Sequence, residues 1–381
     1  MVQEPRERPF RVGISGSYGG LNLGDEAILQ VIVCQLRRRL PVEITVFSRN
    51  PQDTLQRHQV EHAVPVRELS RGEILPKIQS LDLLILGGGG IFFDAEAKLY
   101  LREAMLAREQ GIPVAIYAAG AGPLNDPVVQ QSVRDALSGV ALLTVRERSA
   151  RQVLETAGVG GEILITADPA LLLEPEPLPS GALRREGLEG EHRLVGMSVR
   201  EPGGAAPDIS EEKYHALLAD AADFMVDRFD AEVVFVPMER QVLDMQHSHA
   251  VVAKMLRPQR ATVLKGQYTA GQVLTLMKRF EFAVGMRLHF LIFAALQATP
   301  FVALPYASKV GGFLEDLGMP MPPFQLVNAG RLIAYIDQSW DRRRSLKRHI
   351  EQAVPGLQTR ARQTNELLVQ ILTRQERPAS L

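Results

Sequence analysis

The segment Val284-Gly285-Met286-Arg287-Leu288-His289-Phe290 connects a predicted strand to a predicted helix. The strand covers residues 280–284, which are aromatic and β-branched and lead into a glycine. Apolar residues then recur with helical spacing over residues 288–296. A strand, a turn and a helix in this order form the unit of an open parallel α/β sheet, whose ligands bind at the carboxyl ends of the strands. The turn is therefore a candidate binding site.

Two side chains in this turn, Arg287 and His289, are cationic or can become so. The N–H groups and the dipole at a helix N-terminus favour anions, so a bound anionic ligand would explain both side chains. The alternative is that Arg287 pairs with a nearby carboxylate and that His289 packs against the sheet. Position in the sequence leaves both interpretations open.

The same strand, turn and helix pattern recurs along the chain. Glycine-rich turns follow the predicted strands at residues 10–14, 81–86 and 113–118. The first of these turns lacks the G-x-G-x-x-G spacing of dinucleotide-binding folds, which disfavours a nicotinamide cofactor. The alternation predicts an α/β protein with two Rossmann-like parallel-sheet domains that face each other across a cleft, as in GT-B glycosyltransferases.

Prolines mark the boundary between the two predicted domains, because three of them lie within residues 174–180. The following division lists the predicted parts: a disordered tail over residues 1–9, an N-terminal domain over 10–174, a linker over 175–190, a C-terminal domain over 191–340, and C-terminal helices over 341–381, interrupted at Pro355 and able to cross back to the N-terminal domain.

Composition narrows the functional class. The 381 residues carry a net charge of −1, which gives no field suited to nucleic acid. The single cysteine, Cys34, fits a reducing compartment and is expected to be a buried thiol. No CxxC or HExxH motif occurs, so no metal is expected. The N-terminus has no apolar signal-peptide core, which predicts a cytoplasmic protein. Basic residues over 342–348 leave open a peripheral contact with the inner face of the membrane, as an alternative to a solvated helix face.

Five cationic or potentially cationic side chains share one position, the end of a predicted strand: Arg146, Arg148, Arg287, His289 and Lys309. Glycine turns at Gly16, Gly88 and Gly120 can offer backbone donors beside them. The planar fork of arginine suits carboxylate and phosphate. A substrate that carries both groups would fit this set.

Several polar residues near these turns have simpler explanations. Asp25 lies where a helix N-cap is expected, and Asp168 precedes a proline and can fix a turn. Arg148 is expected to face solvent or to pair with a neighbouring carboxylate. His247 and His249 are expected at the surface of a polar helix.

The chain resembles the polysaccharide pyruvyl transferases, in particular their CsaB-like bacterial cell-wall type. The resemblance begins with Gly16-Ser17-Tyr18-Gly19 and Asn22-Leu23-Gly24-Asp25-Glu26-Ala27-Ile28-Leu29. It continues at residues 87–91, 144–149, 167–169, 285–289 and 309–310, so it covers residues 12 to about 318. The turn at residues 15–20 is richer in glycine than the family pattern, and the tail after Trp340 carries no family motif.

The resemblance implies a GT-B-like fold and transfer of a pyruvyl group from phosphoenolpyruvate to two hydroxyls of a cell-wall or exopolysaccharide sugar. The products are a cyclic ketal and phosphate. Phosphoenolpyruvate is then a co-substrate, and no further cofactor or metal is implied. The sugar acceptor can be lipid-linked.

The family's roles fall on matching positions of this sequence. Arg146 and Arg287 would hold the phosphate and carboxylate of the donor, and His289 would be the acid. Asp25 would orient or deprotonate a sugar hydroxyl. The remaining positions are Lys309, Gly88 and Gly89 for the donor, and Gly16, Tyr18 and Asn22 for the acceptor.

Two other functions remain compatible with the sequence. A GT-B glycosyltransferase could use a nucleotide-sugar donor, with Glu315 binding the ribose. A non-catalytic protein could keep the pocket only to bind a glycan or an anion. The sequence sets neither the acceptor sugar nor the oligomeric state.

Overall fold

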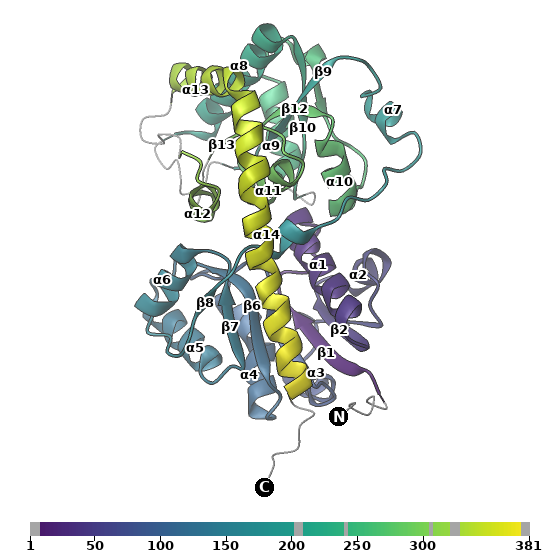
Figure 1. Ribbon diagram of the computed structural model, residues 1–381, viewed down its shortest axis with the longest axis vertical. Coiled ribbons are helices and arrows are strands. Elements are labelled where there is room, and N and C mark those ends of the chain that lie inside the picture. The colour runs from purple at the N-terminus through teal and green to yellow at the C-terminus, as the bar shows by residue number, and fades with distance from the viewer. Residues whose placement is uncertain (1–7, 202–208, 240–242, 305–307, 321–327, 375–381) are drawn as a thin grey trace. The chain divides into compact units, whose positions relative to one another are not determined.

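The computed structural model describes residues 8–201, 209–239, 243–304, 308–320 and 328–374, which Figure 1 shows as a ribbon. They form two compact units. Unit 1 draws on Met1–Gly20, Asp25–Leu172 and Gln358–Leu381, and unit 2 on Leu21–Gly24 and Leu173–Leu357. The chain therefore passes between the units after residues 20, 24, 172 and 357. Most of the predicted disordered tail, residues 1–7, lies outside the described part of the chain.

Unit 1 is built on an eight-stranded sheet whose recorded strand pairings are parallel. The strand order is β3-β2-β1-β4-β6-β7-β8, and β5 pairs with β6 outside this path. The strands are β1 Phe10–Ser15, β2 Val42–Ser48, β3 His62–Pro65, β4 Leu83–Gly87, β5 Gly90–Phe92, β6 Val114–Ala121, β7 Leu142–Val145 and β8 Leu164–Ile165.

The helices of unit 1 follow the strands in alternation. They are α1 Leu23–Arg39, α2 Pro51–Arg57, α3 Arg71–Gln79, α4 Ala97–Glu109, α5 Pro127–Leu137 and α6 Arg148–Thr156, with a 3₁₀ turn η1 Pro169–Leu172. Local sequence explains where some of them begin. Ser70 and Glu73 form a capping box at the start of α3, and Asp126 caps α5 just before Pro127.

The central strands of unit 1 are buried on both faces. Every residue of β4 and β6 is buried, as expected for apolar strands in a parallel sheet covered by helices on both sides. Their side chains share one core with apolar residues of α4, α5 and α6. This core fixes the carboxyl ends of β4 and β6, where the glycine turns follow.

Unit 2 has a five-stranded sheet of the order β11-β10-β9-β12-β13, again with parallel recorded pairings. The strands are β9 Arg193–Ser198, β10 Ala231–Phe235, β11 Ala261–Val263, β12 Phe280–Gly285 and β13 Phe301–Ala303. The accompanying helices are α7 Ala182–Glu186, α8 Glu211–Phe229, α9 Leu243–Val252, α10 Ala270–Met277, α11 Leu288–Leu296, α12 Ser308–Asp316 and α13 Ala329–Asp341, with a 3₁₀ turn η3 Pro258–Arg260.

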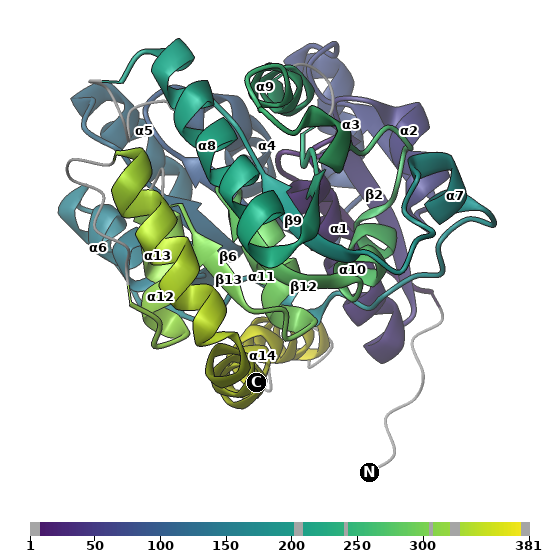
Figure 2. The same ribbon diagram turned by 90° about the horizontal axis from the view of Figure 1, so that it is seen from above.

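An aromatic cluster holds α8 and α13 on one face of the second sheet. The rings of Phe229 and Trp340 stack with their centroids 4.0 Å apart, and Phe282 of β12 meets Trp340 edge to face. The two helices consequently lie side by side (Figure 2). This packing fixes β12, which leads into the turn at residues 285–289.

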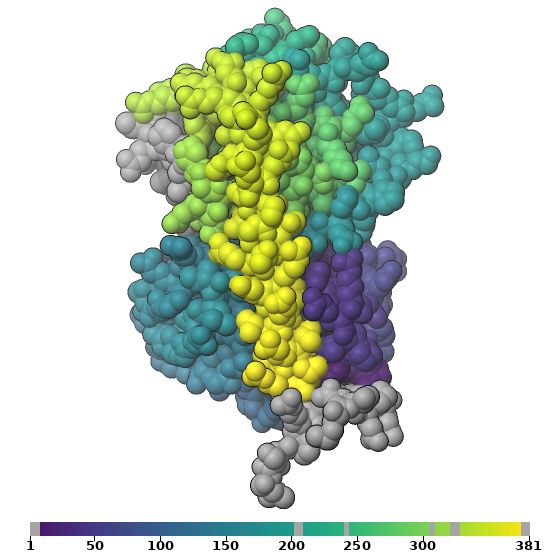
Figure 3. All heavy atoms as spheres, in the orientation of Figure 1, coloured from purple at the N-terminus to yellow at the C-terminus, as the bar shows by residue number. Residues whose placement is uncertain are grey.

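The last described helix, α14 Arg343–Arg374, contributes residues to both units, and Figure 3 shows its atoms in yellow. Within unit 2, His349 lies 2.7 Å from the carbonyl of Leu317. Within unit 1, Thr364 hydrogen-bonds Thr166 at 2.9 Å. The predicted interruption at Pro355 is wrong, because the helix continues through that residue.

The prediction of an α/β protein with two Rossmann-like parallel sheets is confirmed. The expectation of a buried thiol is wrong, since Cys34 lies on the exposed face of α1. Among the described residues, no helix combines the length and the apolar character that a bilayer crossing requires.

Candidate functional site

Arg287 stands between β12 and α11, as the sequence pattern predicts. The strand ends at Gly285, and Arg287 is the N-cap residue of α11. Gly285 is required by close packing, because a Cβ there would lie 2.5 Å from the ring of Phe290. The turn can therefore follow the strand without a side chain in the way of the helix.

Two carboxylates hold the Arg287 guanidinium. Its Nε donates to both carboxylate oxygens of Asp244, at 3.2 and 3.0 Å, and its Nη2 donates to Glu239 Oε2 at 2.9 Å. Asp244 is fully buried on α9, and Arg287 is only 9% exposed. A buried charge needs such a partner. The arrangement therefore matches the alternative in which Arg287 pairs with a nearby carboxylate.

Asp244 also closes the turn after β10. Its Oδ2 accepts the backbone N–H groups of Met238 and Glu239, at 3.0 and 3.1 Å. One buried carboxylate thus fixes both the β10 turn and the β12 turn. Neither Asp244 nor Glu239 was singled out from the sequence as a partner of Arg287.

His289 lies in the first turn of α11 and is half-buried. Its ring packs against the backbone of Gly24, where a Cβ would fall 1.9 Å from His289 Nδ1. Only glycine fits there without movement of the ring. The glycine of the predicted opening motif therefore has a steric reason in unit 2.

Residues 21–24 are attached to unit 2 by backbone contacts. The N–H of Leu23 donates to the carbonyl of Met238 at 2.8 Å, and Asn22 forms an isolated antiparallel bridge with Glu239. The side chain of Asn22 accepts the N–H of Gly24 at 3.0 Å. Unit 2 therefore brings Asn22 to the same turn as Arg287 through Glu239.

Arg146 follows β7 in unit 1 and is also locked in ion pairs. Its Nε donates to Glu147 at 2.7 Å and its Nη1 to Asp168 at 3.0 Å, and the side chain is 3% exposed. Burial alone would lower the pKa of Arg146, but the two carboxylates raise it above its ordinary value. Gly120 makes room for the guanidinium, since a Cβ there would lie 2.7 Å from Nη2.

The glycine turn after β4 lies beneath Asp25. Gly88 and Gly89 both have φ near +75°, a conformation that favours glycine (φ 73° and 76°). A Cβ on Gly89 would lie 2.7 Å from Asp25 Oδ1, so the carboxylate sits close to this backbone. Asp25 is half-buried in the first turn of α1. Unit 1 therefore gathers Asp25, Gly88 and Gly89.

Tyr18 and Gly16 have supporting positions beside that turn. The Tyr18 side chain is fully buried, and its hydroxyl donates to the carbonyl of Gly87. Burial and the nearby Asp25 carboxylate raise the pKa of the Tyr18 hydroxyl. A Cβ on Gly16 would lie 2.7 Å from the Gly87 carbonyl oxygen. Both residues shape the turn after β4 rather than face solvent.

The remaining singled-out residues are distributed as follows. Lys309 is half-buried in the first turn of α12, and residues 305–307 before it lie outside the described chain. Arg148 is exposed, as expected, and Asp168 fixes a turn by accepting the N–H of Ala170 at 2.9 Å. His249 is exposed, but the prediction for His247 is wrong, because its side chain is buried on α9.

Two cavities open at the amino ends of the strands, opposite the edge that carries the turns described above. One, of about 490 Å³, is lined by residues at and just before the starts of β9, β10 and β12. Another, of about 440 Å³, lies where β1, β2 and β3 begin. Ligands of open α/β sheets bind at the carboxyl ends of the strands, so neither cavity is a candidate site.

Comparison with known proteins supports one family. The sequence profile of a family described as polysaccharide pyruvyl transferase matches residues 22–308. The amylovoran biosynthesis protein AmsJ of Erwinia amylovora is 22% identical over 291 residues, which are 73% of this chain and 70% of AmsJ.

Similar solved structures have the same GT-B type of fold. A putative UDP-N-acetylglucosamine 2-epimerase from Listeria monocytogenes aligns with a TM-score of 0.67 and 13% identity, covering 99% of this chain and all of that one (100%). A glycosyltransferase from Rickettsia africae aligns with a TM-score of 0.62 and 11% identity, covering 97% of this chain and 100% of its own. At such identities the likeness concerns the fold alone.

Proposed function

Because the chain belongs to the polysaccharide pyruvyl transferase family, we propose that it transfers a pyruvyl group from phosphoenolpyruvate to two hydroxyls of an exopolysaccharide or cell-wall sugar. Phosphoenolpyruvate is the co-substrate, and the products are a cyclic ketal and phosphate. The observation that carries the proposal is the turn at residues 285–289, which places Arg287 and His289 at the start of α11 within the region that matches the family.

The two carboxylates that hold Arg287 have different roles in this proposal, and the difference leaves room for an anionic donor. Asp244 is fully buried and belongs to the permanent framework of Arg287. Glu239 is different, because 39% of its side chain is exposed. We assign Glu239 Oε2 to the place that a donor carboxylate or phosphate oxygen takes when it binds Arg287 Nη2. The N–H groups at the start of α11 add to the attraction.

His289 is the proposed acid. Protonation of the methylene carbon of phosphoenolpyruvate leaves an electron-poor carbon that a sugar hydroxyl attacks, and histidine can hold and release a proton near neutral pH. The phosphate leaves as the second hydroxyl completes the ketal. One hydroxyl proton replaces the proton given to the methylene carbon, and the other departs with phosphate, so the reaction balances.

Other residues take supporting roles in this proposal. Asp25 follows Gly24, the residue against which His289 packs, and orients or deprotonates a sugar hydroxyl. Lys309 serves as a further ligand for the donor's charge. Arg146 is held by two carboxylates and is almost fully buried, which favours a positioning role near Gly120 over direct donor contact.

Calorimetric titration and product assays test this function. The full chain is titrated separately with phosphoenolpyruvate and with uridine diphosphate, and phosphate release is followed over a panel of sugar acceptors. We expect binding of phosphoenolpyruvate and acceptor-dependent phosphate release, both lost in Arg287→Lys. The release is expected to be lost in His289→Gln, while binding is retained.

Two controls and two opposing outcomes sharpen the test. Arg148→Lys and His249→Gln make the same changes at exposed positions and should leave both signals unchanged. Binding of uridine diphosphate alone would replace the proposal with a nucleotide-sugar glycosyltransferase. Full phosphate release by His289→Gln would remove His289 as the acid.

A further inference from the structure

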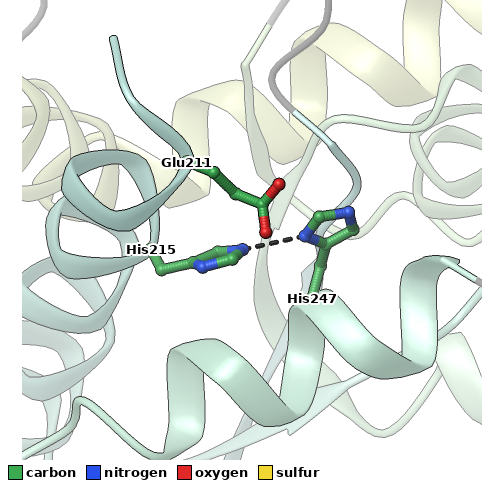
Figure 4. A group of neighbouring side chains, drawn as sticks. All are labelled: Glu211, His215 and His247. Carbon is green, nitrogen blue, oxygen red and sulfur yellow. Dashed lines mark hydrogen bonds between the residues drawn. The ribbon is translucent and has the colours of Figure 1, made fainter.

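Three potential metal ligands converge in unit 2, on the helices α8 and α9. Glu211 and His215 lie four residues apart on α8 and therefore on one face of that helix. His247 comes from α9. His215 Nε2 and His247 Nδ1 are 2.8 Å apart, and the Glu211 carboxylate points toward the gap between the rings (Figure 4). One ligand atom from each residue lies within 4.8 Å of the others.

The environment of this cluster suits a bound ion. Both histidines are only 5% exposed, whereas Glu211 is exposed, so an ion can enter from the side of the carboxylate. The rings meet at an interplanar angle of 47° with nitrogen atoms facing each other, rather than stacking. The nearby cation Lys254 is engaged with Glu212 at 3.4 Å.

We propose that Glu211, His215 and His247 bind one divalent transition-metal ion of the zinc type. Two imidazoles and one carboxylate are ligands that such ions prefer, and magnesium and calcium prefer oxygen ligands. Three protein ligands leave a fourth position to water.

The observed spacing is close to what such an ion needs. Two nitrogens bound at about 2.0–2.1 Å with a tetrahedral angle lie about 3.3 Å apart. The 2.8 Å separation therefore has to open by about half an ångström. Glu211 is the first residue of α8 and is exposed, so its carboxylate can close onto the ion without disturbing the core.

The metal would fasten α9 to α8. His247 lies three residues after Asp244, the buried carboxylate that holds Arg287 and the turn after β10. The ion would thus stabilise the helix that positions Arg287. Metal binding is measured without substrate, so its outcome is independent of whether the protein transfers a pyruvyl group.

The CxxC and HExxH motifs do not describe this set of ligands. The four-residue spacing of Glu211 and His215 is a signal, but it is common on helices. The third ligand is 32 residues beyond His215 and comes near only through the packing of α9 on α8.

Metal titration of the full chain tests the proposal. The chelator-treated Cys34→Ser protein, which removes the exposed thiol as a competing ligand, is titrated with Zn²⁺ by calorimetry and with Co²⁺ by visible absorption. We expect one equivalent to bind, visible bands typical of a four- or five-coordinate site, and a raised melting temperature. Magnesium should produce none of these signals.

Variants decide whether the cluster is the site. His247→Ala and Glu211→Gln should each weaken Zn²⁺ binding at least about tenfold, comparable with the smallest effects of altered metal shells. Glu211 is exposed, so its variant keeps the test valid if His247→Ala fails to fold. The matched changes Glu212→Gln and His249→Ala should bind like the parent. If no one-equivalent signal appears, or if Glu211→Gln and His247→Ala bind Zn²⁺ as tightly as the parent, the histidines form only a hydrogen-bonded pair.

Discussion

Arg287 and Asp244 illustrate how a single residue can depend on a distant partner. Removing the guanidinium in Arg287→Ala leaves the fully buried Asp244 carboxylate with an uncompensated charge. We expect a loss of about 3–5 kcal/mol in the free energy of unfolding, measured with denaturant. Arg148→Ala, at an exposed position, should stay within about 0.5 kcal/mol of the parent. If Arg287→Ala unfolds like the parent, the ion pair has no structural role.

This dependence also explains which residues of the site sequence reasoning could find. Arginine at a strand end is visible from the local pattern, and Arg287 was found in that way. Its partner Asp244 lies 43 positions away, and Asp168 lies 22 positions from Arg146. Such pairs form only when separate strand turns meet at one sheet edge, so local periodicity carries no information about them.

Glu239 supports a second prediction at the residue scale, which rests on the proposed donor. If its carboxylate competes with an anion for Arg287, Glu239→Gln should bind phosphoenolpyruvate more tightly than the parent. Glu239 is the solvent-exposed partner of this pair, and an ion pair open to water is worth about 0.2–1 kcal/mol, so the dissociation constant should fall by up to about fivefold. Calorimetry measures it, with Glu212→Gln as the control because it is also an exposed glutamate of unit 2. Weaker binding by Glu239→Gln would mean that Glu239 helps to hold the donor.

At the scale of elements, the first turn of α1, which contains Gly24, and the first turn of α11, which contains His289, are predicted to be sterically coupled. Gly24→Ala places a Cβ against His289 Nδ1, and overpacking of this kind costs about 1–3 kcal/mol. In a His289→Ala background the cost should shrink, which a double-mutant cycle in denaturant measures. Gly72→Ala on α3 is the control, because a Cβ there meets nothing within 4 Å. An equal cost in both backgrounds would mean that the two positions are not sterically coupled.

The elements themselves were predicted where the apolar pattern is long. Strands such as β4, and the sequence of β12 and α11, follow directly from runs of apolar residues. The short strands β3 and β5 were missed. β3 has four residues and ends in Pro65, and β5 has three residues that begin with Gly90, so neither gives a strand signal of its own. Both are formed by pairing with a neighbour that is already in place.

A property of the whole molecule, its stability as a function of pH, should respond to one buried carboxyl group. Burial raises the pKa of Glu103 above its ordinary value, despite the Arg102 contact. A raised native pKa means that Glu103 favours folding at pH below the unfolded-state pKa and that this contribution is lost as pH rises. A tenfold difference in proton affinity between the folded and unfolded states corresponds to about 1.4 kcal/mol.

Glu103→Gln should therefore gain stability relative to the parent as pH rises from about 4.5, the ordinary pKa of glutamate, toward 8. Denaturant unfolding across this range measures the difference. Glu109→Gln, on the same helix but exposed and paired with Arg71, provides the control. A difference that does not change with pH would show that Glu103 titrates at an ordinary pKa in the folded protein.

The helix α14 gives the last prediction for the whole molecule, because its residues from Gln358 onward belong to unit 1. Leu368 and Leu372 are fully buried there, and Asn365 accepts the hydroxyl of the buried Tyr117. Stopping the chain after Leu357 removes these side chains and uncovers the unit 1 surface on which they pack. The lost burial is worth about 1.5–3 kcal/mol for each leucine, and the Tyr117 hydroxyl loses its acceptor. We therefore expect unit 1 to unfold at a lower temperature than unit 2, so that calorimetry resolves two transitions. A chain that stops after Arg374 keeps the whole described helix and should melt like the full chain. If the chain that stops after Leu357 also melts like the full chain, unit 1 holds its fold without the second part of α14.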